Sequence, residues 1–282
     1  MMNYKIYAYT KMKFDIGIIT LEKKCDLFDL MTRLFPAANV FLQTGVDVRD
    51  SSINNLRDAN IISDYGYTTL SEGRKSHREL NSKGGVGLFL ANKIALLKDV
   101  NTPLLLLEDD CMIKDVDLFV NEINVLLNHQ TEYDLAVFGA GFNPSLEALF
   151  FSYRIRRKCT FLNNDWNYIE GDFTCTHCVL YSPNGRQNIA EHYHDNLSIQ
   201  IDGWLSLLSK RNKIQLLVQE RNHTAIQKHH VSLIQDDFCL MCHFGNGKRA
   251  NTLFMLFLII LLITCFTTCY FVIDKRYKNH IN

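Results

Sequence analysis

Short apolar runs recur along the first two-thirds of the chain, and their spacing predicts alternating strands and helices. Leu104 to Leu107 are four leucines in succession, which is typical of a strand buried on both faces of a sheet. Residues 25–35 instead carry apolar side chains three and four positions apart, and this spacing indicates a helix with one buried face. The ranges expected as strands are 14–20, 39–47, 104–107, 134–141, 173–181 and 214–218, and those expected as helices are 25–35, 84–100, 116–129, 182–192 and the first part of 201–220.

The order of these segments predicts an α/β fold. The chain opens with a strand, a helix and a second strand, an arrangement that favours a parallel sheet. Residues 50–83 are polar, and we expect a long loop with at most one short helix there, while residues 143–164 are expected to be irregular. No linker or repeat interrupts the pattern, so residues 1–247 are expected to form one domain.

Residues 252–273 differ from the rest of the chain because none of these 22 side chains is charged. A helix of this length spans about 30 Å of hydrocarbon. The sequence therefore predicts one C-terminal transmembrane helix, followed by a short basic tail over residues 274–282, and a protein located in a membrane. The amino end has no apolar leader, which favours a tail-anchored protein with a cytosolic domain. Basic residues flank the span on both sides and leave the opposite orientation open, in which sequons at Asn196 and Asn222 would be open to glycosylation.

The composition is that of a protein that can bury a core, with 47% hydrophobic and 21% charged residues in a chain of 282. Thirty basic and thirty acidic side chains leave no net charge. Because nucleic-acid binding usually shows as a basic excess, no nucleic-acid partner is expected.

Three consecutive carboxylates follow the leucine run directly. Glu108, Asp109 and Asp110 repel one another and favour no secondary structure. They make chemical sense where a cation neutralises them, and hard ions such as Mg2+ or Mn2+ prefer oxygen ligands. In open α/β sheets, ligands bind beyond the carboxyl ends of the strands, which is where these acids are expected. The alternative is a solvated acidic turn.

The nine cysteines are odd in number and give no support to a disulfide framework. Two CxxC pairs occur, at Cys175 and Cys178 and at Cys239 and Cys242. A zinc site built from both pairs is a third interpretation of the chain. Against it, about 60 residues separate the pairs where about 15–20 are usual.

Four blocks of sequence make the chain similar to glycosyltransferase family 25, the lipopolysaccharide and collagen-type galactosyl- and glucosyltransferases. These blocks are FDIGIIT from residue 14, GGVGLFLANKIALLK from residue 84, PLLLLEDDCMI from residue 103 and CTHCVLYSPNGRQNIAE from residue 175. The motifs IDGWL and LLVQERNHTAI follow in the order found in the family, so the likeness covers roughly residues 14–227. The acidic block is the sharpest single match.

The resemblance implies a Rossmann-like, GT-A type nucleotide-sugar-binding domain that uses Mn2+ or Mg2+ and inverts the anomeric carbon. It also implies a hexosyltransferase whose partners are a nucleotide-sugar donor, expected to be UDP-linked, and a glycan, glycolipid or protein acceptor. By family position, Glu108 and Asp110 are expected as metal ligands and Asp109 as a second-rank contact. Asp202 is expected as the catalytic base, with the N-cap of the following helix as the alternative role.

Further residues of the donor site are also placed by the resemblance. Thr20 at the end of the first strand and His177 in the Thr-His block are expected to line the nucleotide-sugar site. The alternatives for His177 are contact with the metal and an ordinary buried position in the core. His223, His229 and His230 are three candidates for a histidine that completes the metal shell, and the sequence leaves the choice among them open.

The chain also departs from the family pattern. Where the family has Ser-His, this chain has Ala91 and Asn92, and where the family has an acidic residue between glycines it has Gly85. The family glycine before Thr-His is Cys175 here. These changes favour the alternative of an inactive member that serves as a sugar- or protein-binding module, whereas the intact acidic block opposes it.

Overall fold

The structure is a computed structural model, and it describes residues 13–73, 78–80, 82–140, 154–163, 165–171, 173–193, 196–219, 224–227, 256–264 and 267. In chain order the elements are β1 (Asp15–Thr20), α1 (Asp26–Leu34), β2 (Asn39–Thr44), α2 (Ile53–Asp58), α3 (Asp64–Glu72), α4 (Lys83–Leu97), β3 (Leu104–Glu108), β4 (Cys111–Ile113), α5 (Val116–Asn128), β5 (Leu135–Val137), β6 (Arg154–Lys158), β7 (Trp166–Glu170), β8 (Cys178–Tyr181), α7 (Pro183–Ala190), α8 (Ile201–Lys210), β9 (Leu216–Gln219) and β10 (Ala225–Gln227).

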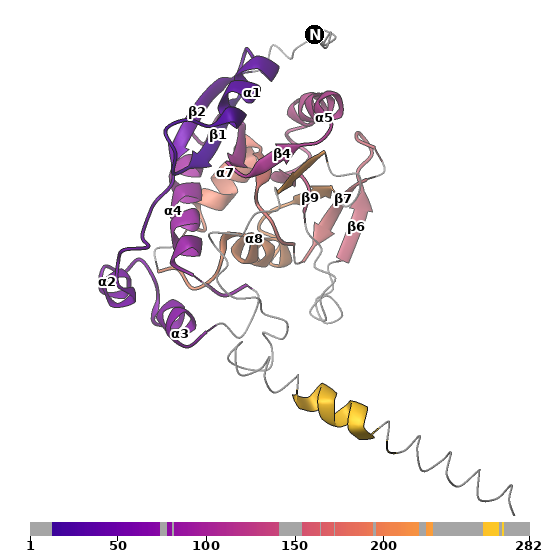
Figure 1. Cartoon of the computed structure of the whole chain (residues 1–282). Helices are drawn as coiled ribbons and strands as arrows, with labels where there is room; N and C mark the ends of the chain where they lie inside the picture. Colours follow the sequence, from indigo (N-terminus) through magenta and orange to yellow (C-terminus); the bar gives the residue numbers. More distant parts are fainter. Residues whose placement is uncertain are drawn as a thin grey trace, which may run out of the picture.

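The central sheet has eight strands in the order β2-β1-β3-β8-β5-β9-β7-β6, and β10 pairs with β4 in a small second sheet (Figure 1). Strands β2, β1 and β3 are parallel, as the opening strand–helix–strand order predicts. Strand β8, however, runs antiparallel to both of its neighbours, β3 and β5, and β7 runs antiparallel to β9 and β6. The α/β class is therefore observed, but with a mixed sheet rather than the expected parallel one.

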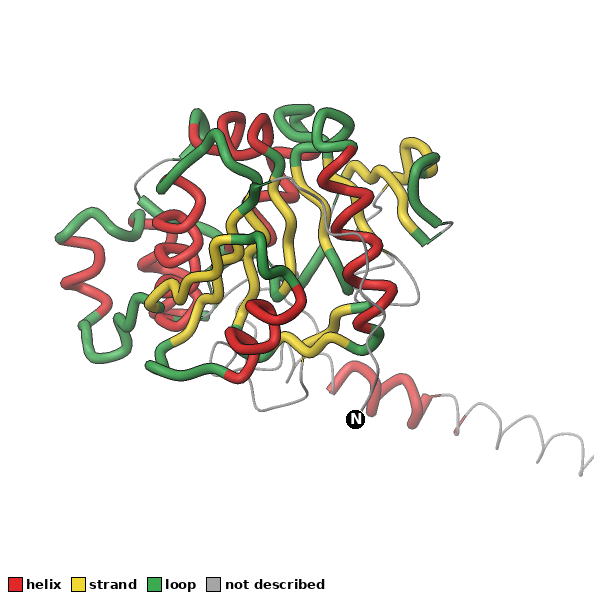
Figure 2. Tube along the Cα trace, turned by 90° about the horizontal axis from the view of Figure 1, so that it is seen from above, coloured by secondary structure: helices red, strands yellow, loops and turns green. Residues whose placement is uncertain are grey.

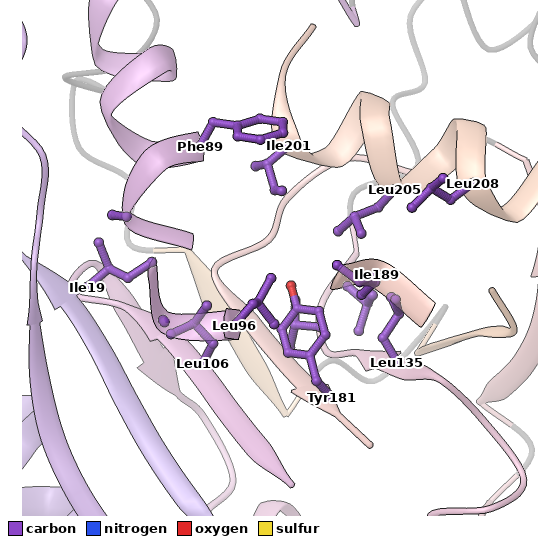
Figure 3. Close-up of a cluster of buried hydrophobic side chains, with 14 of the residues drawn as sticks. Ile19, Phe89, Leu96, Leu106, Leu135, Tyr181, Ile189, Ile201, Leu205 and Leu208 are labelled. Atoms are coloured by element: carbon purple, nitrogen blue, oxygen red, sulfur yellow. The ribbon is translucent and has the colours of Figure 1, made fainter. Parts of the chain in front are cut away.

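Strand β3 is buried on both faces, as its leucine run predicts. Leu104 and Leu106 pack in a cluster with residues of α4, α7 and α8, part of which Figure 3 shows. Leu105 and Leu107 point the other way, into a cluster with residues of α1 and α5. The sheet thus forms an inner layer with helices on both faces (Figure 2), and the carboxyl end of β3 carries the acidic block.

Two regions contain more regular structure than the sequence predicts. Residues 50–83 hold α2 and α3, whose N-caps are Ser52 and Ser63, and each serine oxygen accepts a backbone N–H from the first turn of its helix. In the region expected to be irregular, β6 forms an edge strand. An edge strand tolerates charged residues because one side of it faces solvent, and these residues are the reason why the sequence of β6 does not indicate a strand.

Two expected strands are shorter in the structure than in the sequence prediction. Strand β8 begins at Cys178 rather than at residue 173, because Cys175 has a φ of 75° and cannot belong to an extended strand. Strand β5 ends at Val137, two residues before Gly139, which has a φ of 59°.

The prediction of a transmembrane helix over residues 252–273 is corrected by the structure, and with it the prediction of a single-pass membrane location. Within the described part of the chain, no helix combines the length and the apolar character needed to cross a membrane. The basic tail at 274–282 lies outside the described residues.

Candidate functional site

A cavity of about 560 Å3 opens at the carboxyl ends of β1 and β3. Its lining includes Thr20 and all three carboxylates Glu108, Asp109 and Asp110. Its other wall is made by the loop after β2, residues 45–49, and by the first half of α4. This is the end of the sheet at which α/β proteins bind ligands.

The backbone holds the acidic block between two neighbouring strands. The Glu108 N–H donates to the His177 carbonyl oxygen at 3.0 Å, and the Asp109 N–H donates to the Ile19 carbonyl oxygen at 3.1 Å. Within the block, Glu108 is buried, Asp109 is exposed and Asp110 is half-buried. The three carboxylates therefore meet the cavity at three different depths.

Glu108 is the deepest of the three carboxylates, and its pKa is raised to about 8. Burial is the main cause, and the nearby charge of Asp110 adds to it. A hydrogen bond donated by Thr176 Oγ1 to Glu108 Oε1, at 3.0 Å, acts in the opposite direction. Without a neutralising partner, this carboxyl group therefore retains a proton at neutral pH.

Asp110 is held by a residue that is distant in sequence. Gln227 Nε2, on β10, donates to Asp110 Oδ2 at 2.7 Å. Gln227 lies between His223 and His229, two of the histidines expected near the metal, but all three candidate histidines lie outside the described residues. Among the residues that the structure does describe, the contact from this segment to the acidic block is made by an amide.

The far wall of the cavity is fixed by close packing of the loop after β2 against α4. Gly87 leaves room for the Val46 carbonyl oxygen, which a Cβ at this position would overlap. Lys83 donates to the backbone oxygens of Arg49 and Ser51, the latter at 3.0 Å. The last glycine of the GGVG sequence at the start of α4 is thus required by backbone packing beside the cavity.

The same wall carries mixed charge. Arg49 donates two hydrogen bonds to the carboxylate of Asp47, at 2.9 and 2.6 Å, and both side chains are largely exposed. The side-chain hydrogen bond from Arg49 lowers the pKa of Asp47 to about 2. Gly84, in the first turn of α4, lines the cavity next to this pair, so the partial positive charge of that helix end lies at the same wall.

Thr20, the predicted donor-site residue at the end of β1, lines the cavity. It is buried, and its Oγ1 accepts the Glu22 N–H at 3.0 Å, which shapes the turn out of β1. His177 is also buried, but it does not belong to the lining: its backbone oxygen holds the strand end, and its ring packs close to Gly139.

Asp202, the predicted base, is the second residue of α8. The N-cap of that helix is Gln200, so the alternative role of Asp202 as an N-cap is wrong. The charge of Asp202 is one of the smaller contributions to the raised pKa of Glu108. Asp202 does not line the described cavity.

Three residues at which the chain differs from the family that it resembles, Ala91, Asn92 and Gly85, have different surroundings. Ala91 lines the cavity, whereas Asn92 is outside its lining and donates to the Leu88 carbonyl oxygen in its own helix at 2.9 Å. Gly85 is buried at the start of α4, and its N–H donates to the N-cap Ser82. Of the pair Ala91 and Asn92, Ala91 is therefore the residue that lines the cavity, and Asn92 bonds within its own helix.

Two residues of the site carry no strong sequence signal. Gln227 belongs to no motif, and its contact with Asp110 depends on the pairing of β10 with β4. Thr176 is part of the Thr-His block, and that resemblance is the signal that points to it, although its hydrogen bond to Glu108 appears only in the fold.

The carboxylates of the cavity fit a divalent cation whose remaining ligands are water and substrate phosphates. Among the described side chains, no three His, Cys, Asp or Glu residues converge to form a complete metal site. Mg2+ is commonly held by one or two carboxylates, with water and substrate phosphates completing its shell. Asp109 and Asp110, which line the cavity and offer only oxygen atoms, fit a cation that arrives with a diphosphate. Cys239 and Cys242 of the zinc alternative lie outside the described residues.

Comparisons with known proteins give likeness in structure but not in sequence. No family model matches the chain, and no curated protein matches it. A UDP-glucose pyrophosphorylase complexed with UDP-glucose aligns with a TM-score of 0.40 and 13% identity, over 76% of this chain and 92% of that one. The UTP-bound UGPase from Acinetobacter baumannii aligns with a TM-score of 0.39 and 7% identity, over 77% and 88%. A197 from STIV aligns with a TM-score of 0.33 and 13% identity, over 80% and 100%. Alignments this weak leave function to be argued from the site itself.

Proposed function

We propose that this chain is a metal-dependent glycosyltransferase that moves a hexose from a nucleotide-sugar, of the UDP-linked class, to an acceptor hydroxyl. One observation carries the proposal. Three carboxylates at the end of a buried central strand open onto the same cavity as the N-terminal half of α4. One cavity thus offers oxygen ligands for a cation and a positive helix end for an anion, and a metal-bound diphosphate needs both.

The donor would lie across the cavity between the acidic block and α4. Asp109 and Asp110 would hold a Mn2+ or Mg2+ ion, whose chemistry there is to neutralise the negative charge of the leaving diphosphate. Thr20 and the loop over residues 45–49 would contact the nucleotide, because they line the cavity together with the segment that follows β1. The sequence predicts Glu108 rather than Asp109 as the partner of Asp110 at the metal. Because Glu108 is buried and bonded to Thr176, we propose instead that it supports the acidic block from beneath.

Asp202 is the residue that we propose as the general base. It would accept the proton of the acceptor hydroxyl as that oxygen bonds to the anomeric carbon and the bond from that carbon to the diphosphate breaks. Attack from the face opposite the leaving group gives inversion. Asp202 acts on the pKa of Glu108 yet does not line the cavity, which supports this division of roles.

The test uses the full chain and a panel of UDP-sugars with Mn2+, and it follows release of UDP. We expect turnover of one donor, abolished by EDTA and reduced by about 100-fold or more in Asp110→Asn, because a lost cation ligand removes charge stabilisation of the leaving group. Asp117→Asn is the matched control, since Asp117 is an exposed aspartate in the first turn of α5 and does not line the cavity.

Three other outcomes separate the alternatives. Binding of a UDP-sugar without turnover would favour a sugar-binding module. Failure of the folded protein to bind any nucleotide would reject the proposal altogether. Equal turnover in wild type and Asp110→Asn would remove the acidic block from the mechanism.

A further inference from the structure

Glu122, on α5, is a buried carboxylate away from the cavity. Only 1% of its surface is exposed. Four side chains donate hydrogen bonds to it: Trp166 Nε1 at 2.8 Å, Thr224 Oγ1 at 3.0 Å, Gln219 Nε2 at 3.1 and 3.2 Å, and Asn163 Nδ2 at 3.3 Å. Each of these contacts is donated to Glu122, and together they oppose the burial that raises the pKa of its carboxyl group.

These hydrogen bonds join elements that are far apart in sequence. Glu122 connects α5 to β7 through Trp166, to β9 through Gln219, and to the residue before β10 through Thr224. Thr224 is also fixed by its own backbone: its N–H donates to Gln219 Oε1 at 3.1 Å, and its carbonyl oxygen accepts the Lys114 N–H at 2.8 Å. The start of β10 is therefore anchored to the buried carboxylate.

Strand β10 leads directly from this anchor to the acidic block. It pairs antiparallel with β4, with Gln227 opposite Cys111, the residue that follows Asp110. The Ala225 carbonyl oxygen lies against Gly139 so closely that a Cβ there would overlap it. At the end of the strand, the Gln227 amide donates to Asp110 Oδ2 at 2.7 Å.

We propose that Glu122 is a positioning residue for the acidic cavity: it fixes β10, and β10 places the Gln227 amide on Asp110. The inference rests on the proposed function, since it treats Asp110 as a cation-binding carboxylate. Gln227 holds one oxygen of Asp110 in a fixed direction, which limits the orientations in which this carboxylate meets a cation. Residues that orient a ligand in this way strongly affect metal affinity.

The experiment measures the affinity of the folded full chain for Mn2+ in the presence of saturating UDP, by calorimetry. Gln227→Met keeps the size of the side chain and removes the hydrogen bond to Asp110, and it should weaken Mn2+ binding by about tenfold. Thr224→Val removes one hydrogen bond to Glu122 and should weaken Mn2+ binding through the same strand. Gln187→Met is the control, because Gln187 is exposed on α7 and contacts Asn101 at the surface.

Two further measurements distinguish positioning from a general role in stability. In the double variant, the Thr224→Val effect on Mn2+ affinity should vanish once residue 227 is methionine, because the two residues act in series. Glu122→Gln places an amide donor among the donors that surround Glu122, and it should weaken Mn2+ binding. Without metal it should also speed hydrogen exchange of the Lys114 amide, which donates to the Thr224 carbonyl oxygen.

The outcomes are separable. If wild type binds Mn2+ and UDP but Gln227→Met and Thr224→Val bind Mn2+ within twofold of it, the positioning role is wrong and the proposed function stands. Additive effects of Thr224→Val and Gln227→Met would also overturn the inference. If folded wild type binds neither Mn2+ nor UDP, the proposed function fails and this inference fails with it.

Discussion

At the scale of single residues, backbone strain beside the acidic block is concentrated at one cysteine. Four non-glycine residues have positive φ in the described part of the chain: Asn60, Asn196 and Asn212, which tolerate it, and Cys175 at 75°. Cys175 immediately precedes Thr176, which bonds Glu108. Strain of this kind often occurs at functional sites, where the surrounding structure enforces it.

Cys175→Gly should stabilise the folded protein. A glycine removes the Cβ penalty of positive φ, worth about 1–2 kcal/mol, and the extra freedom of the unfolded glycine offsets part of this gain. We expect the free energy of unfolding in urea to rise by about 1 kcal/mol. Cys175→Ala is the control: it keeps the Cβ and should give no gain, and an equal gain in both variants would rule out relief of backbone strain.

At the scale of elements, α4 links the cavity to the core through its two ends. Its N-terminal half forms a cavity wall, while its C-terminal carbonyl oxygens are bound by Arg186 of α7. Arg186 is 1% exposed and donates four hydrogen bonds, to the backbone oxygens of Leu96 at 3.0 and 2.8 Å, Ala95 at 3.0 Å and Thr102 at 2.6 Å. A cation at a helix C-terminus also complements the helix dipole. Arg186 therefore fixes the C-terminal end of the helix whose other half forms a wall of the cavity.

Arg186→Met should destabilise the protein by about 3 kcal/mol or more, because buried carbonyl oxygens lose their donors while the apolar stem is kept. Arg186→Lys should recover little, since one ammonium group cannot reproduce the planar fork that reaches three carbonyl oxygens. Urea unfolding measures both, with Arg211→Met, at the exposed end of α8, as the control. A loss under about 1 kcal/mol in Arg186→Met would show that water replaces the guanidinium.

The elements that the sequence predicts best are those whose buried apolar residues recur at the spacing of a strand or a helix. Leu104 to Leu107 predict β3 because both faces of that strand are covered, and the predictions for α1, α4 and α5 agree with the structure. Strand β6, with the sequence RIRRK, cannot be recognised from the sequence, because it pairs with β7 alone at the edge of the sheet and carries charged residues. The acidic block could be predicted as a unit, whereas the Gln227 contact could not, because it depends on a pairing between strands about 110 positions apart in the chain.

At the scale of the whole molecule, the balanced net charge conceals a local excess of acid. The formal net charge is zero, yet the charges of Asp109, Asp110 and Asp202 all act on Glu108 at the end of the sheet. Burial and these neighbours raise the pKa of Glu108 to about 8. The folded, cation-free protein therefore retains a proton at Glu108 over a pH range in which the same carboxyl group of the unfolded chain, with its ordinary pKa of 4.5, has released it.

This difference in proton binding predicts the direction in which stability changes with pH. Between about pH 5 and 8 the folded state binds more protons than the unfolded state, so the free energy of unfolding falls as pH rises. The two pKa values differ by about 3.5, which sets an upper limit of about 5 kcal/mol on the loss. Glu108→Gln, which cannot ionise, should match wild type near pH 5 and exceed it in stability at pH 8. Urea unfolding in EDTA at several pH values measures both proteins, with the exposed Glu191→Gln as the control, whose curve should run parallel to that of wild type. Parallel curves for Glu108→Gln and wild type would mean that Glu108 ionises freely in the fold, and the acids would then need no cation to offset their repulsion.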